Sequence, residues 1–316
     1  MKKIKNLFKK IKNPPFFYYY CHHVISKYVP EKFALKISNF NKKAYLPDEN
    51  EFFLSTYDGS NQCVHPDMLF FNNKYWLAVT PYPYGMEEYE NPCIYYGNSI
   101  NSLISVSDNP IEKQRKHKRG FHLSDPCIFE WNSRIICAFR ENIKKNNEEI
   151  TYIYYTSSDD GVNWTSSELI LQSPNDKLLS PAFYVEEENN NQIIHMNYVS
   201  YTNGSSSITH CILDENMNII DIETQACENM PENYYIWHIA VSYENGMKIS
   251  TGSKIKYGLF LIRNKTNSDI YKLYLTEQDN NGTWNFIKEI DIKDAIKNIC
   301  YHPYKSCFIP NSQSII

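Results

Sequence analysis

Apolar runs of strand length recur along this chain and are separated by polar turns. Examples are KYWLAVTPYP (74–83), RIICAFRE (134–141), ITYIYYTSSDDG (150–161) and QIIHMNYVSY (192–201). These runs are rich in β-branched and aromatic residues, and the chain contains 26 tyrosines, a bias that favours strands. The pattern predicts an all-β protein, and a helix is expected only in the basic segment at the N-terminus.

One short phrase returns five times: a polar residue, usually followed by proline, and then an apolar run. Aligning the five copies places the residues His65, Asp125, Ser180, His238 and His302 in register. The intervals between them are 60, 55, 58 and 64 residues, and each holds about four strand-like runs. Repeats of this length built from strands are typical of propeller blades, which leave no open sheet edge. We therefore predict that each phrase begins the innermost strand of a blade.

The predicted fold is a five-bladed β-propeller spanning residues 36–316, preceded by a basic amphipathic segment at 1–35. Few residues follow the fifth phrase, so residues 36–59 are expected to supply the missing strands of the last blade and close the ring. The stretch SSDDGVNW (157–164) resembles the Asp-box hairpin of sialidase-like propellers. In that hairpin Asp159 is expected to cap the turn, Gly161 to take a positive φ, and Trp164 to pack between blades.

The whole arrangement resembles the five-bladed glycosidase propellers, the group of arabinanases, xylosidases, fructosidases and mannoside phosphorylases. The phrases HPD (65–67), SDP (124–126) and LSP (179–181) carry this resemblance. It implies a funnel in which acidic residues at the starts of the inner strands act as base, acid and pKa modulator. Asp125 matches such a position, whereas His65 and Ser180 stand where carboxylic acids are expected, and this departure weakens the case for a carboxylate-pair hydrolase.

Several other side chains are predicted to meet at the same funnel. Alternation along a strand puts His65 and Asp67 on one face, and loops between the second and third strands bring further groups to the mouth. Convergent carboxylates, imidazoles and an arginine suit acid–base chemistry on a sugar. The predicted catalytic residues are Asp125, Asp67, His65, Glu90 and Glu141, and the predicted substrate-binding residues are Arg140, His238, His302, Lys305, Tyr82 and Trp237. Each could instead be structural, Asp125 as a turn cap and His238 as a channel histidine. No metal site is predicted.

Two basic segments suggest partners. The run EKQRKHKRGFH (112–122) leads into the second inner strand, so Arg115, Lys116, Lys118 and Arg119 are predicted to bind phosphate, although such a run is more often a solvated loop. Residues 2–12 form a lysine-rich amphipathic pattern that either contacts the inner membrane face peripherally or is a frayed tail. No stretch is long enough to cross a bilayer, and nothing indicates nucleic-acid binding.

The composition supports a cytoplasmic location. The nine cysteines have no CxxC pair and lie in apolar contexts, as reduced buried thiols do, and the net charge is only −4. A cytoplasmic chain with a basic segment and a phosphate clamp favours glycosyl transfer from a phosphate-bearing donor, such as a nucleotide sugar, in polysaccharide synthesis on a glycan or sugar-phosphate substrate. The alternatives are a glycoside hydrolase of the five-bladed type and a non-catalytic glycan-binding propeller.

Overall fold

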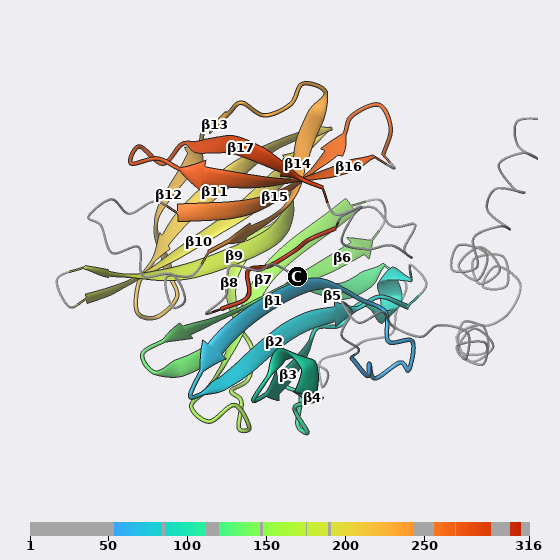
Figure 1. Cartoon of the computed structure of the whole chain (residues 1–316), viewed down its shortest axis with the longest axis vertical. Coiled ribbons are helices and arrows are strands. Elements are labelled where there is room, and N and C mark those ends of the chain that lie inside the picture. Colours follow the sequence, from blue (N-terminus) through green and yellow to red (C-terminus); the bar gives the residue numbers. More distant parts are fainter. Residues whose placement is uncertain are drawn as a thin grey trace, which may run out of the picture.

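The computed structural model describes residues 54–83, 86–111, 120–145, 148–174, 176–188, 191–242, 256–268, 270–291 and 304–310. Within these ranges the chain folds into four sheets, each built from strands consecutive in the sequence and antiparallel except for one short parallel pair. Figure 1 shows the four sheets arranged around a central region, as blades are in a propeller. The all-β, propeller-like prediction is therefore confirmed.

The blades follow one another along the chain. Blade one comprises β1 (Cys63–Phe71), β2 (Lys74–Pro81), β3 (Cys93–Gly97) and β4 (Ile104–Ser105), with short 3₁₀ helices η3 (Glu87–Tyr89) and η4 (Ile100–Ser102). Blade two comprises β5 (Phe121–Trp131), β6 (Arg134–Lys145), β7 (Glu148–Ser158) and β8 (Glu168–Ser173). Blade three comprises β9 (Lys177–Glu188), β10 (Asn191–Thr202), β11 (Ser205–Leu213) and β12 (Ile219–Gln225). Blade four comprises β14 (Tyr234–Val241), β15 (Lys256–Asn264), β16 (Tyr271–Gln278) and β17 (Trp284–Ile290), with β13 (Cys227–Glu228) pairing parallel to β17.

Four of the five repeated phrases form inner strands, as predicted, and the fifth, at His302, lies outside the described residues. Strands β1, β5, β9 and β14 contact one another in that order. The segment 304–310 packs against both end blades, because Cys307 and Ile309 join the core of blade one while Tyr304 and Phe308 pack against the core of blade four. Figure 1 shows this dark red segment between the sheets. It lies where the inner strand of a fifth blade is expected, and the blade count of five remains a prediction.

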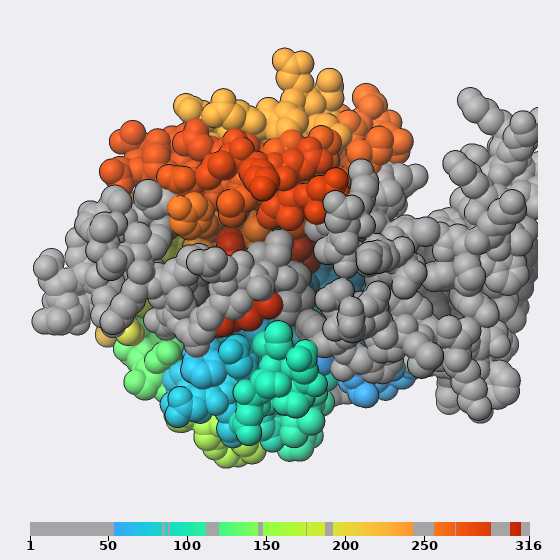
Figure 2. Space-filling model, viewed as in Figure 1, coloured from blue at the N-terminus to red at the C-terminus, as the bar shows by residue number. Residues whose placement is uncertain are grey.

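Apolar side chains between neighbouring blades hold the sheets together. One buried cluster joins blades one and two, a second joins two and three, and a third joins three and four. On the face shown in Figure 2, blade four (orange and red) and blade one (blue to teal) lie at opposite ends. Burial of apolar surface between blades thus replaces a single central core.

The Asp-box hairpin ties blade two to blade one, with one change from the expectation. Gly161 has a φ of 75°, and a Cβ there would lie 1.9 Å from the ring of Trp76 in blade one, so only glycine fits. Trp164 packs against the cluster between the two blades. The cap, however, is Asp160, whose Oδ1 accepts from the backbone N–H groups of residues 162 and 163, whereas Asp159 pairs with Arg134. Asp159 was therefore the wrong choice of cap.

Three of the expected features lie outside the described residues. These are the N-terminal segment 1–35 with its proposed membrane contact at 2–12, the closing strands up to residue 53, and the basic run with Arg115, Lys116, Lys118 and Arg119. His302 also lies outside them. In the part of the chain that the structure describes, no helix is long and apolar enough to cross a membrane.

Candidate functional site

The polar residues of the first three phrases share an unusual backbone conformation. His65, Asp125 and Ser180 have φ values of 56°, 51° and 53°, and each precedes a proline. Non-glycine residues seldom adopt positive φ, and such strain is found most often at functional sites. The strand pairing skips at each of these positions, which are therefore β-bulges. A bulge redirects a side chain, and here it turns three corresponding side chains toward the centre of the molecule.

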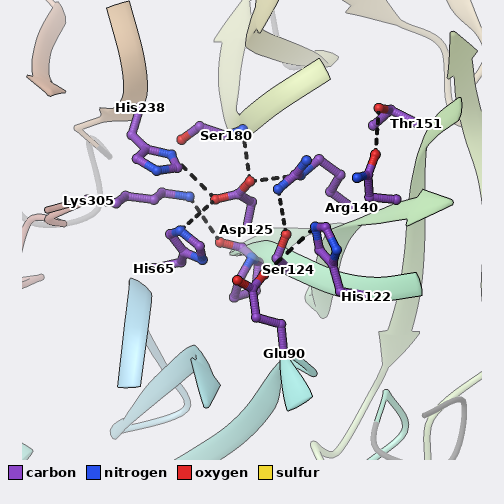
Figure 3. Close-up of polar contacts among 12 residues, drawn as sticks. His65, Glu90, His122, Ser124, Asp125, Arg140, Thr151, Ser180, His238 and Lys305 are labelled. Atoms are coloured by element: carbon purple, nitrogen blue, oxygen red, sulfur yellow. Dashed lines mark hydrogen bonds and ion pairs between the residues drawn. The ribbon is translucent and has the colours of Figure 1, made fainter. Parts of the chain in front are cut away.

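Asp125 lies at the centre of the resulting cluster (Figure 3). It is fully buried, and its Oδ2 atom lies 2.9 Å from Arg140 Nε and 3.4 Å from the backbone nitrogen of Ser180, which donates to it. Its Oδ1 atom lies 3.4 Å from His65 Nε2 and 3.5 Å from His238 Nδ1. One carboxylate thus connects inner strands from blades one, two, three and four.

The aromatic and cationic groups of segment 304–310 complete the cluster. The ring of Tyr304 lies 5.3 Å from that of His65 and 4.9 Å from that of His238, and these two imidazole rings are 4.8 Å apart. Lys305 is buried, and its Nζ donates to the carbonyl of Pro126 over 3.5 Å. The channel cluster is hereafter His65, Asp125, Arg140, His238 and Lys305.

Burial and neighbouring charges shift the pKa values of the carboxyl and imidazole groups in the cluster. Burial opposes ionisation of Asp125, but its electrostatic interactions with His65, Arg140, His238 and Lys305, in that order, hold its pKa well below the usual range. Burial lowers the pKa of His65 to about 4 and that of His238 well below its usual value. At neutral pH the site therefore contains an ionised carboxylate beside two neutral imidazoles.

A second carboxyl group, Glu90, has the opposite character. It follows the 3₁₀ helix η3 and is buried, with its Oε2 atom 3.9 Å from His122 Nε2. Burial raises the pKa of Glu90 well above the usual range, an effect that Arg140 only partly offsets, and burial lowers the pKa of His122 to about 3. Glu90 and Asp125 are thus two buried carboxyl groups whose pKa values are shifted in opposite directions, and Figure 3 shows both on the same side of Arg140.

The other predicted site residues lie at varying distances from the cluster. Asp67 is buried at its base, where Oδ2 accepts from the backbone nitrogen of Ile128 at 2.7 Å and so links blades one and two. Glu141 points to the other face of β6, where it interacts with Tyr154. Trp237 packs edge-on against His238 with Arg263 over its ring, and Tyr82 is half-buried beyond the end of β2.

Two contributors were missed from the sequence. Tyr304 stands next to Lys305, and His122 stands three residues before Asp125, but neither lies at a repeated position. A cation site was also not expected, yet the ligand atoms of His65, Asp125 and His238 all lie within 4.8 Å of one another. Two imidazoles and a carboxylate are a donor set that divalent transition metals accept.

Comparisons with known proteins support the fold and not a family. No family model matches the chain, and no curated protein matches its sequence. Among solved structures, an N-acetylgalactosamine deacetylase from F. plautii in complex with a blood group B trisaccharide is similar with a TM-score of 0.61. That match has 15% identity and covers 77% of this chain and 71% of the other. A xylan β-1,4-xylosidase from Bacillus halodurans C-125 gives a TM-score of 0.52 at 10% identity and covers 73% of this chain and 42% of the other.

These comparisons correct the expectation of glycosyl transfer. The two structures described above are named as a deacetylase and a xylosidase, both hydrolases, so the findings support the hydrolase alternative better than glycosyl transfer. The nucleotide-sugar donor and the role in polysaccharide synthesis depended on transfer, so they are not supported either. The resemblance to five-bladed glycosidases is confirmed at the level of the propeller fold.

Proposed function

We propose that the protein is a hydrolase that acts on a glycan. The observation that carries this proposal is the pair of buried carboxyl groups whose pKa values are shifted in opposite directions: that of Asp125 well below its usual range, and that of Glu90 well above its own because of burial. Environments that push two carboxyl pKa values apart are how hydrolases separate an acid from a charged partner. The propeller fold, shared with enzymes named for their action on sugars, supports a carbohydrate substrate.

Each group has a role that its surroundings favour. Glu90 donates its proton to the leaving atom of the substrate while a water oxygen bonds to the carbon under attack, and the bond to the leaving atom breaks. The proton that this water loses returns to Glu90, which restores the acid. Asp125 orients the imidazoles of His65 and His238 around the reacting water, and Arg140 keeps Asp125 ionised.

Two kinds of bond are compatible with this arrangement. The Glu90 and Asp125 pair favours a glycosidic bond, which needs a neutral acid and an ionised carboxylate. The second candidate is the bond to an acyl substituent on a sugar. Oδ2 of Asp125 already contacts Arg140 and Ser180, so this oxygen is not available as the base that the glycosidic reaction would use. The deacetylase named among the similar structures also supports acyl hydrolysis.

The test is a substrate panel with two readouts. Purified full-length protein would be incubated with chromogenic glycosides and with N-acetylated and O-acetylated oligosaccharides, and both new reducing ends and free acetate would be measured. We expect one of the two products, and a loss of at least about 100-fold in rate for Glu90→Gln, since proton donation contributes roughly 10²- to 10⁴-fold. Glu168→Gln, which changes an exposed carboxylate on β8, is the matched control and should leave the rate unchanged. A panel with neither product, or Glu90→Gln at full rate, would contradict the proposal.

A further inference from the structure

Several buried atoms of the channel cluster have no hydrogen-bond partner within the described residues. They are both ring nitrogens of His65, both ring nitrogens of His238 and Oδ1 of Asp125. Buried polar atoms are nearly always hydrogen-bonded, because each unsatisfied one costs about 1–3 kcal/mol. The three side chains direct polar atoms at one another, but at separations of 3.4 and 3.5 Å these atoms are too far apart for ordinary hydrogen bonds. A bound cation would satisfy three of these atoms together: His65 Nε2, His238 Nδ1 and Asp125 Oδ1.

Two of the three separations between these atoms fit a shared metal ion better than direct hydrogen bonds, and all three ligand atoms lie within 4.8 Å of one another, so the two imidazoles would move closer together on binding the ion. Oδ1 of Asp125 lies 3.4 Å from His65 Nε2 and 3.5 Å from His238 Nδ1, which is beyond the usual hydrogen-bond length. Two ligand atoms that are each about 2.1 Å from a tetrahedral zinc ion are roughly 3.4 Å apart. We propose that His65 Nε2, His238 Nδ1 and Asp125 Oδ1 bind one divalent transition-metal ion, with zinc as the best fit.

The surroundings of the three ligands support this assignment. Oδ2 of Asp125 is held by Arg140 Nε and the backbone nitrogen of Ser180, which leaves Oδ1 directed at the imidazoles. Such outer contacts are what orient metal ligands in known sites. Calcium, which takes six to eight oxygen ligands, fits this donor set poorly.

Three protein ligands leave one position of a tetrahedral ion open. Catalytic zinc sites have this composition and hold a water there, whose pKa the ion lowers to about 7. The use of such a water rests on the proposed hydrolase function, since it would supply the attacking oxygen, whereas metal binding itself does not depend on that function.

The site is tested by measuring metal binding without any substrate. Full-length protein would be dialysed against a chelator and titrated calorimetrically with zinc chloride, and in parallel with calcium chloride. We expect one equivalent of zinc with a Kd of about 1 μM or tighter, and calcium binding at least 100-fold weaker. His65→Gln and His238→Gln should each raise the zinc Kd at least 100-fold, because each removes one of three ligands.

The matched control is the double variant His195→Gln, His210→Gln, which removes two other buried histidines in blade three. It should keep the wild-type zinc affinity. Circular dichroism would establish that each variant is folded, and a zinc anomalous peak between the three side chains in a soaked crystal would support the site where a variant fails to fold. Equal zinc binding by all variants, no binding by the wild type, or an anomalous peak elsewhere would overturn the proposal.

The two proposals fail separately. Stoichiometric zinc at these ligands together with no product from any substrate in the panel would reject the glycan hydrolase and leave the metal site standing. Glycan hydrolysis by protein that neither binds zinc in the titration nor shows the anomalous peak would reject the metal site and leave the hydrolase standing.

Discussion

The molecule contains two pairs of buried histidines that differ in their hydrogen bonds: the rings of one pair contact each other through nitrogen atoms, and those of the other pair do not. In blade three, His195 Nδ1 and His210 Nε2 lie 3.0 Å apart, and His210 Nδ1 lies 3.1 Å from Glu223 Oε1. The His195 ring also stacks on Tyr184 at 4.7 Å with only 3° between the planes. In the channel, the rings of His65 and His238 are tilted by 56°, and their nitrogens have no hydrogen-bond partner in the described part of the chain.

The difference follows from how each pair is brought together. The blade-three pair lies on neighbouring strands β10 and β11, so sheet register alone places the rings in contact, as cross-strand pairs are placed in any sheet. The channel pair comes from blades one and four, and bulged strands turn the two side chains to a common point. Histidines that a sheet pairs locally serve stability, whereas buried histidines gathered from distant blades without hydrogen-bond partners among the described residues, one of them (His65) at a positive φ, indicate a functional site.

The largest expected effect is the loss of enzymatic rate when Asp125 in the channel cluster is replaced. Asp125→Asn removes the charge that both imidazoles face, so the rate on the substrate found in the panel should fall at least about 10³-fold, equivalent to about 4 kcal/mol. The blade-three double variant His195→Gln, His210→Gln should stay within about twofold of wild type. If kcat/KM fell equally in both variants, the distinction between the two pairs would not stand.

The fold-level part of this comparison was predictable from the sequence. The repeated phrase located all four described inner strands, because a propeller repeats its packing environment in every blade. It also located His65, Asp125 and His238, since equivalent positions of a closed ring converge on its axis. The repeat identifies only positions that are equivalent from blade to blade. Tyr304 and His122 lie at non-equivalent positions, so the spacing could not identify them.

The function and the direction of individual side chains were less accessible. Glu141 was grouped with Arg140 because the two are adjacent, but adjacent strand residues face opposite ways, and Glu141 interacts with Tyr154 instead. Glycosyl transfer was inferred from charge in the segments 1–35 and 112–122, and charge runs do not specify chemistry. The opposite ionisation of Asp125 and Glu90 needs burial to arise, and burial is a property of the folded chain.

The next effect in size concerns acid stability. Burial lowers the pKa of His65 from 6.5 to about 4, so the folded protein binds fewer protons at this ring than the unfolded chain does. The resulting stability is present above pH 6.5 and is lost as the pH falls toward 4, by about 3 kcal/mol for this group alone. Urea unfolding of metal-free protein at pH 7.5, 5.5 and 4.5 should show the loss, and His65→Gln should reduce it. A pH profile of His65→Gln identical to that of wild type would contradict this assignment.

A smaller effect is expected from the blade-three pair. Replacing His195 by phenylalanine keeps the stacking on Tyr184 but leaves His210 Nε2 without its partner, which should cost about 1–3 kcal/mol. Urea unfolding at pH 7.5 measures this loss, and activity under folding conditions should be unchanged. A loss of activity at unchanged stability would show that the blade-three pair, too, takes part in function.

The smallest effect on the free energy of unfolding is expected at Glu223, the exposed residue that contacts His210. Glu223 accepts from His210 Nδ1, but its side chain is 58% exposed, so water screens the pair and can replace the contact. Glu223→Gln retains an oxygen that can accept the same hydrogen bond, and the free energy of unfolding should change by no more than about 0.5 kcal/mol. Urea midpoints at pH 7.5 and in added salt would measure it, with Glu228→Gln on β13 as the exposed control. A change in the free energy of unfolding above about 1.5 kcal/mol would mean that the charge of Glu223 sets the protonation of His210 and His195. The blade-three pair would then not be a neutral, structural pair, and its contrast with the channel pair would fail.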